Sequence, residues 1–367
     1  MSSRNRLIES RSHRAFCLSL RASYDDQVSR ESDSIISAAR RHDRDAFDAL
    51  ARPLRKELLL HCYRMLGSLH EAEDMVQEAL LRAWRAIDRF EPHASFRAWL
   101  YKIATNACLD VLRVKGARTF PTSVYPAANP LEPVAHGADE VQWLEPFPDA
   151  SLLDSSNDPE EHYARREFIS LAFIAALQRL PRRQRAALIL CDVLDWRAIE
   201  VADMLGMTVP AVNSALHRAR TTMAKHPSTK GALPPTDQRL VSLVSEFVEA
   251  MESRDLPRLL ALLTADARWI MPPLSTWYQG RDAIGTFVAT RVFAADARGI
   301  ARRRILTRAN GQPALAIYHQ SPVRPVCEAF ALQVLTIDET SWQISEVTTF
   351  LTPGLFPAFG LPKEIQM

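Results

Sequence analysis

Residues 198–217, AIEVADMLGMTVPAVNSALH, have the residue types and the spacing of a helix-turn-helix. On its second helix the outward side chains are small, polar or basic, and such groups suit base edges and phosphates in a major groove. The predicted contact residues are Ala211, Asn213, Ser214, His217 and Arg218, with Arg220 on phosphate. The alternative is an ordinary pair of packed helices with a solvated face.

The residues between these helices predict how the motif is held. Gly206 stands where the chain must turn, a position that favours a residue tolerant of positive φ. Thr208 is a good N-cap, and Pro210 falls in the first turn of the next helix, where its missing N–H costs little. The buried face predicted for the first helix is Ile199, Ala202 and Leu205, and for the second Val212, Leu216 and Ala219.

An upstream segment, residues 71–90, predicts a helix with one apolar and one acidic side. Its apolar stripe is Ala72, Met75, Val76, Ala79, Leu80, Ala83, Trp84 and Ile87, and its acidic side is Glu73, Asp74, Gln77 and Glu78. Acidic residues near a helix start are favoured by the macrodipole, so this side also has a purely structural explanation.

The next predicted helix, from Ser95, mixes aromatic and basic side chains: Phe96, Trp99 and Tyr101 with Arg97, Lys102, Arg113, Lys115 and Arg118. Aromatic rings receive unstacked bases while cations follow the phosphate backbone, as in single-strand binding. Phe96, Trp99, Leu100 and Ile103 are equally well explained as core residues.

Composition limits the remaining classes. A chain of 367 residues predicts two or three domains, and a net charge of +2 argues against a nonspecific nucleic-acid coat. The five cysteines are far apart and form no C-x-x-C pair, so we expect no disulfide framework. His61, Cys62 and His70 are interpreted as packing residues rather than a metal site, and no metal or cofactor is expected.

No apolar stretch reaches the length needed to cross a bilayer, and we expect a cytoplasmic protein that does not engage the membrane. Residues 1–40, which carry arginines among serines without a long apolar run, are predicted to be a disordered arm.

Two linkers are predicted from composition, at residues 117–160 and 227–236. The first is rich in proline. It is either a plain spacer or a segment whose acidic residues imitate nucleic acid; these acidic residues are Asp139, Glu140, Glu145 and Asp149.

Residues 237–367 change pattern, with helical periodicity at residues 241–251 and 256–263 followed by β-rich stretches. These are residues 267–271, 300–308, 314–319, 329–337 and 342–350. Asn310–Gly311 predicts a tight hairpin. Helices followed by a curved antiparallel sheet indicate an α+β domain around a cone-shaped cavity. The predicted pocket residues are Trp269, Trp277, Tyr278, His319 and Trp342.

Taken together, three stretches resemble an extracytoplasmic-function (ECF) RNA polymerase sigma factor: residues 61–90, residues 96–113 and the run LPRRQRAALILCDVLDWRAIEVADMLGMTVPAVNSALHRAR. WLEPFPD, MPPLSTWYQG and LFPAFGLP resemble the sigma-G-like subgroup, which carries a C-terminal SnoaL-like (NTF2-like) domain. The fold that this implies is two all-α sigma domains, a region 2 bundle at 41–116 and a region 4 helix-turn-helix domain at 161–226, followed by an α+β SnoaL-like domain at 237–367.

The resemblance also implies partners and sites. Core RNA polymerase would be bound through its β′ clamp helices and β flap, with Asp74, Met75, Val76, Gln77 and Glu78 as the core-binding residues of region 2. The minus-ten element of promoter DNA would be captured and melted by Glu91, Ser95, Phe96, Trp99, Asn106 and Arg113, and the minus-thirty-five element read by the residues of the second helix named above. The proline-rich linker would thread toward the polymerase active-site cleft.

The C-terminal domain leaves alternatives open. Relatives of its fold include isomerases and cyclases with a buried general base, for which Asp266, Asp282 and His319 are the candidates. Asp266 and Asp282 stand at cap-like positions, so we expect no enzyme. The domain would instead bind a small-molecule ligand or contact the sigma domains and modulate their activity. A dimeric helix-turn-helix regulator that binds palindromic DNA without polymerase is the third alternative.

Overall fold

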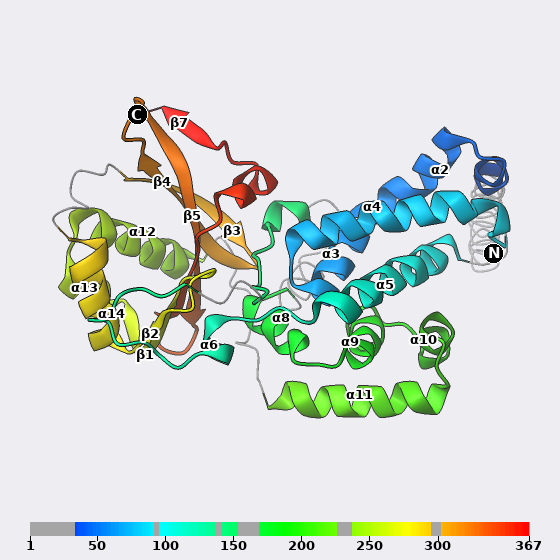
Figure 1. Cartoon of the computed structure of the whole chain (residues 1–367), viewed down its shortest axis with the longest axis horizontal. Coiled ribbons are helices and arrows are strands. Elements are labelled where there is room, and N and C mark those ends of the chain that lie inside the picture. Colours follow the sequence, from blue (N-terminus) through cyan, green and yellow to red (C-terminus); the bar gives the residue numbers. More distant parts are fainter. Residues whose placement is uncertain are drawn as a thin grey trace, which may run out of the picture. The chain divides into compact units, whose positions relative to one another are not determined.

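The computed structural model describes residues 34–91, 95–136, 141–152, 169–225, 237–294 and 302–366 (Figure 1). Most of the predicted N-terminal arm, as well as Asp139 and Glu140, lies outside these ranges. Residues 34–40 are helical, so that part of the predicted arm is ordered secondary structure.

The described chain forms two compact units, and both are interleaved in sequence. One contains the residues up to Leu59 together with Asp74–Ala107, and the other contains Leu60–Glu73 together with the chain from Cys108 onward. The division between the two units runs through three helices.

The helices of the N-terminal half are α2 (Arg44–Ala51), α3 (Arg55–Leu66), α4 (Leu69–Ala86) and α5 (Phe96–Lys115), with short 3-10 turns at Arg52–Leu54 and Ile87–Arg89. In the first unit, aromatic rings from these helices pack edge to face or tilted, with centroid distances of 5.1–6.1 Å. The cluster consists of Phe47, Trp84, Phe90, Phe96 and Trp99. Such pairs add stability beyond the burial of their area.

The middle of the chain is also helical. It contains α6 (Pro121–Val124), a 3-10 turn at Asp149–Leu152, α8 (Leu171–Gln178), α9 (Arg182–Leu188), a π-turn at Ile189–Val193, α10 (Ala198–Leu205) and α11 (Val209–Ala224).

The C-terminal elements form an α+β domain. Its helices are α12 (Gln238–Ser253), α13 (Leu256–Ala261) and α14 (Arg281–Phe287), with a π-turn at Val288–Val292 and a 3-10 helix at Pro353–Phe359. Its strands are β1 (Leu263–Ile270), β2 (Trp277–Gln279), β3 (Arg302–Ala309), β4 (Gln312–Gln320), β5 (Val326–Asp338), β6 (Gln343–Phe350) and β7 (Glu364–Gln366).

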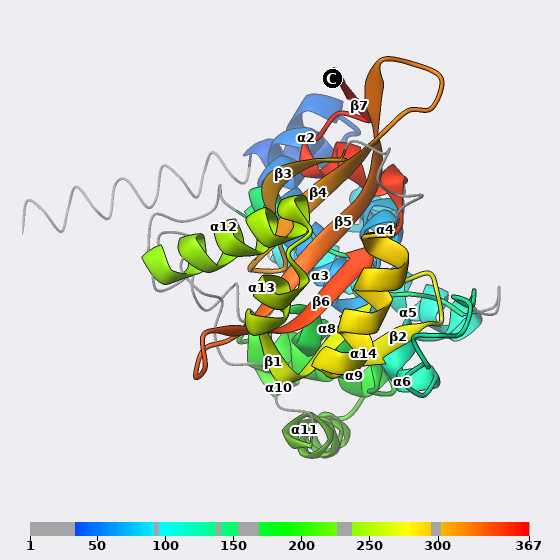
Figure 2. The same ribbon diagram turned by 90° about the vertical axis from the view of Figure 1, so that its left-hand side faces the viewer.

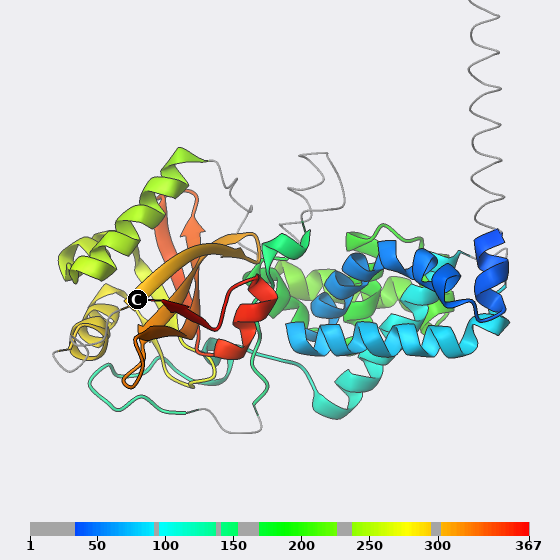
Figure 3. The same ribbon diagram turned by 90° about the horizontal axis from the view of Figure 1, so that it is seen from above.

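The sheet has the order β2-β1-β6-β5-β4-β3, with β7 pairing with β5. Helices α12, α13 and α14 cover one face of this sheet (Figure 2) and share a core with it. The 3-10 helix Pro353–Phe359, drawn in red, lies on the other side of the sheet from α12 (Figure 3). The helices and the curved sheet therefore enclose the apolar interior of the domain.

The sheet differs from the expected one in two ways. The β1–β6 pair is parallel, whereas a fully antiparallel sheet was predicted. The short strands β2 and β7 were not predicted. Alternation along a strand fixes which residues face the core, but it does not fix the direction of a partner strand that is remote in the chain.

The predicted hairpin between β3 and β4 is confirmed. Asn310 and Gly311 form its two-residue turn between the paired residues Ala309 and Gln312, with φ angles of 55° and 74°. Both residues tolerate this left-handed conformation, which matches the twist of the flanking strands.

None of the helices within the described ranges is long and apolar enough to cross a membrane.

Candidate functional surfaces

The helix-turn-helix consists of α10 and α11, and its turn follows the predicted chemistry. Gly206 adopts φ 59°, and the amide of Met207 donates to the Ala202 oxygen at 2.9 Å. The Thr208 hydroxyl accepts from the amide of Ala211 at 3.3 Å and caps α11. Of the predicted buried residues one is wrong: Ile199 is 59% exposed, because α10 turns Val201 inward beside Ala202 and Leu205. On α11, Val212, Leu216 and Ala219 are buried as predicted.

Five of the six predicted DNA-contact residues on α11 are exposed. Asn213, Ser214, His217 and Arg218 are exposed, and within the described chain no other side chain bonds to theirs. Ala211 is half-buried.

Arg220 is also exposed, but unlike the other four residues it has a side-chain partner. Its guanidinium makes two bonds to the Asp192 carboxylate, at 2.7 and 2.8 Å. Its hydrogen bonds to Asp192 raise the pKa of Arg220 further. This arginine is already committed to an ion pair that links α11 to the π-turn before α10, so phosphate contact would have to compete with Asp192.

The acidic face of α4 presents Asp74 and Gln77 as exposed side chains. Glu78 is half-buried and bonds to the Arg82 guanidinium at 2.7 Å, and Met75 is also half-buried. Val76 is only 8% exposed, because its position in the apolar stripe turns it into the helical core. We therefore remove Val76 from the predicted contact residues.

Of the residues predicted to capture the minus-ten element, some are exposed and others are buried. Glu91, Asn106 and Arg113 are exposed, and Arg113 lies 3.6 Å from Asp110. Ser95 is exposed, and its hydroxyl accepts from the amide of Ala98 at the start of α5. This bond gives Ser95 a structural role.

The two aromatic members of that set belong to the aromatic cluster. Phe96 is 9% exposed, so its ring is a core element rather than a surface for a base, which corrects the prediction. Trp99 is half-buried and packs on Phe90 at 5.1 Å, so part of its ring remains at the surface.

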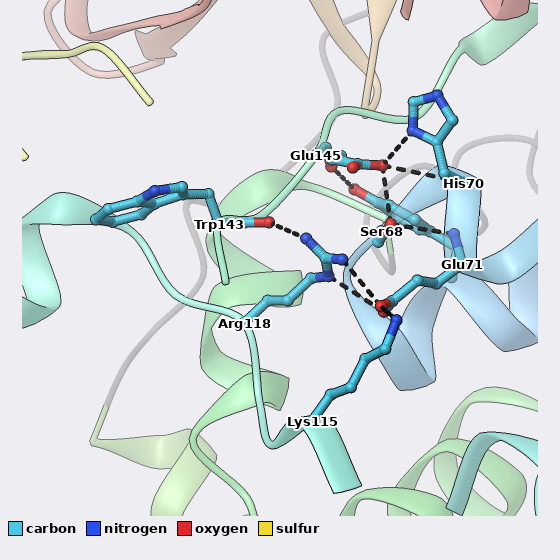
Figure 4. Close-up of polar contacts among 8 residues, drawn as sticks. Ser68, His70, Glu71, Lys115, Arg118, Trp143 and Glu145 are labelled. Carbon is cyan, nitrogen blue, oxygen red and sulfur yellow. Dashed lines mark hydrogen bonds and ion pairs between the residues drawn. The ribbon is translucent and has the colours of Figure 1, made fainter. Parts of the chain in front are cut away.

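The proline-rich linker is not a plain spacer where it is described. The Glu145 carboxylate accepts from the Ser68 hydroxyl at 2.9 Å and from the amide and ring Nδ1 of His70 at 3.2 and 3.1 Å (Figure 4). Ser68 in turn accepts from the amide of Glu71. A carboxylate at a helix start satisfies free amides and is favoured by the macrodipole, so Glu145 stabilises the first turn of α4.

A second set of contacts holds the same turn. Arg118 bonds to the Glu71 carboxylate and to the Trp143 oxygen, and Lys115 reaches Glu71 at 2.8 Å (Figure 4). Burial raises the pKa of Glu71, but the bonds from Arg118 and Lys115 outweigh it and hold the pKa below its usual value. The α4 helix that carries the exposed acidic face therefore begins inside a network built from the linker.

Asn310 joins the hairpin tip to three other segments. Its Oδ1 accepts from the amide of Phe147 at 2.7 Å, and its Nδ2 donates to the Tyr63 phenol oxygen at 2.9 Å and to the Ile169 oxygen at 2.7 Å. The Tyr63 hydroxyl donates to the backbone oxygen of Glu145 at 2.7 Å. Asn310 is fully buried, so the three bonds of its side chain are shielded from water.

The neighbouring residues of the hairpin extend this contact. The Asp149 carboxylate accepts from the amide of Gly311 at 2.8 Å and from Arg308 at 3.2 Å. Asp149 and Glu145 thus both point into the protein, which contradicts the hypothesis that they present an outward imitation of nucleic acid.

The C-terminal domain contains a cavity of about 260 Å³. Its walls are mostly apolar and include Trp269, Met251, Phe287 and Phe330, with a few polar groups. Two of the five predicted pocket residues, Trp269 and His319, line it.

The other three predicted pocket residues do not line it. The Trp277 indole N–H donates to the Tyr125 oxygen at 3.0 Å, and Tyr278 is a core residue stacked on Phe287. Trp342 lies under the Arg239 guanidinium, 3.7 Å from its ring centroid. Of the candidate bases only His319 lines the cavity, since Asp266 and Asp282 are exposed.

Two further buried residues, Arg185 and Gly67, have structural roles that the sequence did not predict. Arg185 is 1% exposed, and its guanidinium donates to the Met65 and Leu180 oxygens and to both oxygens of Gln178. Burial lowers the pKa of Arg185 to about 10. No motif marks it, because an arginine buried for helix docking has the same spacing signal as a surface arginine.

Gly67 is the second missed feature. It has φ 71°, and a Cβ there would collide with the Leu144 side chain. Its oxygen accepts from the amide of Glu145 at 3.0 Å. The glycine therefore permits the linker to approach the α3–α4 turn closely.

Among the described residues, no group of three or more His, Cys, Asp and Glu side chains is arranged to hold a metal ion. His61 and Cys62, both fully buried, lie in the helical core.

Three known families match separate segments of this chain. Residues 50–118 match Sigma-70 region 2, residues 170–223 match Sigma-70 region 4, and residues 244–336 match the SnoaL-like domain. The two helical modules and the appended α+β domain thus define the class of proteins that direct RNA polymerase to promoters.

Full-length relatives define the family more closely. The ECF RNA polymerase sigma factor SigG of Mycobacterium tuberculosis is 44% identical over 325 residues, which is 88% of this chain and 85% of the relative. SigW of Bacillus subtilis is 29% identical over 52% of this chain and 93% of its own length. The crystal structure of M. tuberculosis SigJ matches 87% of this chain and all of its own with a TM-score of 0.55 at 24% identity, which supports the fold.

The chain therefore belongs to the ECF RNA polymerase sigma factors. It is an alternative sigma factor that directs transcription initiation, and proteins of this class bind core RNA polymerase and promoter DNA.

Proposed function

We propose that this sigma factor contacts core polymerase through Asp74, Met75, Gln77 and Glu78. The exposed acidic face of α4 supports this role, with the β′ clamp helices as the partner and the β flap as the partner of region 4. For the minus-ten element the proposed contacts are Glu91, Trp99, Asn106 and Arg113. For the minus-thirty-five element they are Asn213, Ser214, His217 and Arg218.

The C-terminal domain is proposed to be an intramolecular regulator that holds the linker. The observation that supports this proposal most strongly is the set of bonds made by Asn310. Its side chain bonds to Tyr63, to Phe147 in the linker and to Ile169 before α8. In the sigma factors that this chain resembles, the corresponding linker is expected to thread toward the polymerase active-site cleft, and we propose the same course here during initiation. A linker docked by Asn310 would have to detach first, so docking opposes assembly with polymerase.

The contact between the linker and the C-terminal domain includes enough hydrogen bonds to influence the equilibrium between the docked and the detached linker. Besides the Asn310 bonds, the Ala128 amide donates to the Trp277 oxygen at 2.9 Å, and the Ala135 amide donates to the Thr276 hydroxyl at 2.7 Å. A typical hydrogen bond contributes about 1 kcal/mol net. A few such bonds suffice to shift a two-state equilibrium by one or more powers of ten.

For the C-terminal domain we propose binding and regulation rather than catalysis. Among the described residues no Asp or Glu lines the cavity, so the carboxylate base of an isomerase-type site has no counterpart there. A dimeric regulator is not favoured, because the exposed face of α4 and the match to region 2 call for a polymerase partner. We place its action in the cytoplasm, where the bacterial polymerase works.

Reconstitution with core polymerase tests the first proposal. The purified full chain should start transcription from a promoter only when core enzyme is present. The double variant Asp74→Lys, Gln77→Lys should lower core affinity by at least tenfold, because it cancels the negative charge of the acidic side and places two cations on it. Glu246→Lys, an equally exposed acidic residue on α12, is the matched control and should bind core normally. Equal core affinity of the double variant and the control would reject this surface.

A further inference from the structure

The cavity of the C-terminal domain has an apolar interior with basic groups at its wall. Trp269, Met251, Phe287 and Ile317 supply apolar surface, and the cavity has a volume of about 260 Å³. A mostly apolar pocket with a few placed polar groups is the usual form of a small-molecule site.

The charged side chains of the wall are arginines. Arg304 and Arg291 line the cavity beside His319, and among the described lining residues none is acidic. The Arg304 side chain is only 4% exposed, and its Nη1 forms an ion pair with Glu252 at 3.8 Å. A guanidinium buried beside an apolar space favours a ligand carboxylate, which it binds through paired N–H groups.

A neutral polar group completes the wall. Gln333 is 2% exposed, and its Nε2 donates to the Thr349 hydroxyl at 3.0 Å. Its Oε1 is buried at the cavity without a hydrogen-bond partner in the described part of the chain. Because buried polar atoms are nearly always paired, this oxygen indicates a ligand that brings an O–H or N–H donor.

The linker forms part of the same wall. Val134 lines the cavity beside Leu274, and the neighbouring Ala135 is fixed by its bond to Thr276 and by a bond of 3.2 Å from the Ser275 amide to its oxygen. A molecule in the cavity would therefore touch the linker itself.

We infer that this cavity binds a largely apolar organic acid whose carboxylate pairs with Arg304 and whose O–H or N–H group donates to Gln333, and that the bound acid holds the linker in its docked position. The regulatory sense of this inference rests on the function proposed above. The acid adds apolar contact to Val134, so it stabilises the docked state and lowers the fraction of chain that is competent for polymerase.

Binding of paired probes to the full chain tests the ligand class. Three largely apolar acids that also carry a hydroxyl group, 12-hydroxydodecanoate, 6-hydroxy-2-naphthoate and 3-(4-hydroxyphenyl)propionate, are each titrated calorimetrically beside their neutral primary amides. At least one acid should bind ten times or more tighter than its amide. Arg304→Met should remove this preference, whereas Arg303→Met, on the exposed side of the same strand, should keep it. Equal affinity for acid and amide, or no binding by any of the three acids, would overturn the inference.

Hydrogen exchange tests the coupling to the linker. Amides in residues 125–136 should exchange at least fivefold more slowly with the bound acid, and Val134→Asp should weaken acid binding. Unchanged exchange at saturation would refute the coupling. The effect of releasing the linker on polymerase binding is measured without any ligand, so a failure of the ligand inference is distinguished from a failure of the proposed function.

Discussion

The side-chain amide of Asn310 donates a hydrogen bond of 2.9 Å to the phenol oxygen of Tyr63, although these residues are 247 positions apart. Tyr63 belongs to α3, within the match to region 2, and Asn310 forms the tip of a hairpin in the SnoaL-like domain. Burial raises the pKa of Tyr63, so its hydroxyl keeps its proton and continues to donate to Glu145. The Asn310 side chain thus joins the SnoaL-like domain to α3, and both atoms of its amide group are hydrogen-bonded.

Asn310→Asp should loosen the linker. The carboxylate keeps the left-handed turn and the acceptor for Phe147, but it loses the donors and faces the Ile169 oxygen. We expect amide exchange in residues 143–149 to rise at least tenfold, measured by mass spectrometry. The same change at exposed Asn129, which also lies in the linker, should leave these amides unchanged. Protection equal to wild type in Asn310→Asp would contradict the role of its donors.

Gly67→Ala should weaken the docking of Leu144. A side chain at φ 71° costs about 1–2 kcal/mol, and the new Cβ also collides with Leu144. Gly116→Ala is the matched control, because its φ is 81° and no atom lies within 4 Å of its Cβ. Thermal unfolding should therefore show a greater loss for Gly67→Ala. Equal losses would mean that Leu144 moves aside freely.

Acid should destabilise the protein partly through His61. Burial lowers the pKa of His61 to about 3, with a further contribution from Arg64, whereas an unfolded histidine titrates near 6.5. The unfolded chain then binds more protons, so this stability is full above about pH 6.5 and is lost as the pH falls toward about 3. Between pH 7 and pH 5 the loss is about 2 kcal/mol.

His61→Gln should remove that part of the pH dependence. Free energies of unfolding from urea titrations at pH 7 and pH 5 give the slope for each protein. Because the comparison is between slopes, it does not depend on the absolute stability of the variant. An identical slope in both proteins would show that His61 is not buried in its neutral form.

Arg218→Gln should lower the salt dependence of promoter binding. Each phosphate contact contributes about 0.9 to the slope of log affinity against log salt. Holoenzyme carrying Arg218→Gln is expected to lose about one unit of slope or to change its preference at the minus-thirty-five element. Arg303→Gln in the C-terminal domain should change neither. If Arg218→Gln also changes neither, the exposed face of α11 is assigned wrongly.

The sequence predicted local structure well where local chemistry decides it. Gly206, Thr208 and the pair Asn310–Gly311 have the roles expected of them, because turns and caps depend on a few adjacent residues. The apolar stripe of α4 was also correct, and it buries Val76. Val76 had been assigned to a contact surface as well, although one side chain cannot serve both faces.

Contacts between remote segments could not be predicted. The roles of Tyr63, Gly67 and Arg185 depend on segments that meet only after folding, and the parallel β1–β6 pair has the same cause. The pocket was predicted from aromatic residues, yet Trp277 and Trp342 are used for packing. The type of a residue shows that its side chain would suit a pocket. Only the fold shows which of the suitable side chains face the pocket.

Core affinity of Asn310→Gly tests the central claim most directly. Glycine keeps the turn at φ 55° without strain and removes the side-chain bonds to Tyr63, Phe147 and Ile169. In an equilibrium assay with purified core RNA polymerase and no added ligand, the variant should bind at least fivefold tighter than wild type and initiate more transcripts at one promoter. Affinity equal to or weaker than that of wild type would contradict the claim that the C-terminal domain holds the linker away from polymerase.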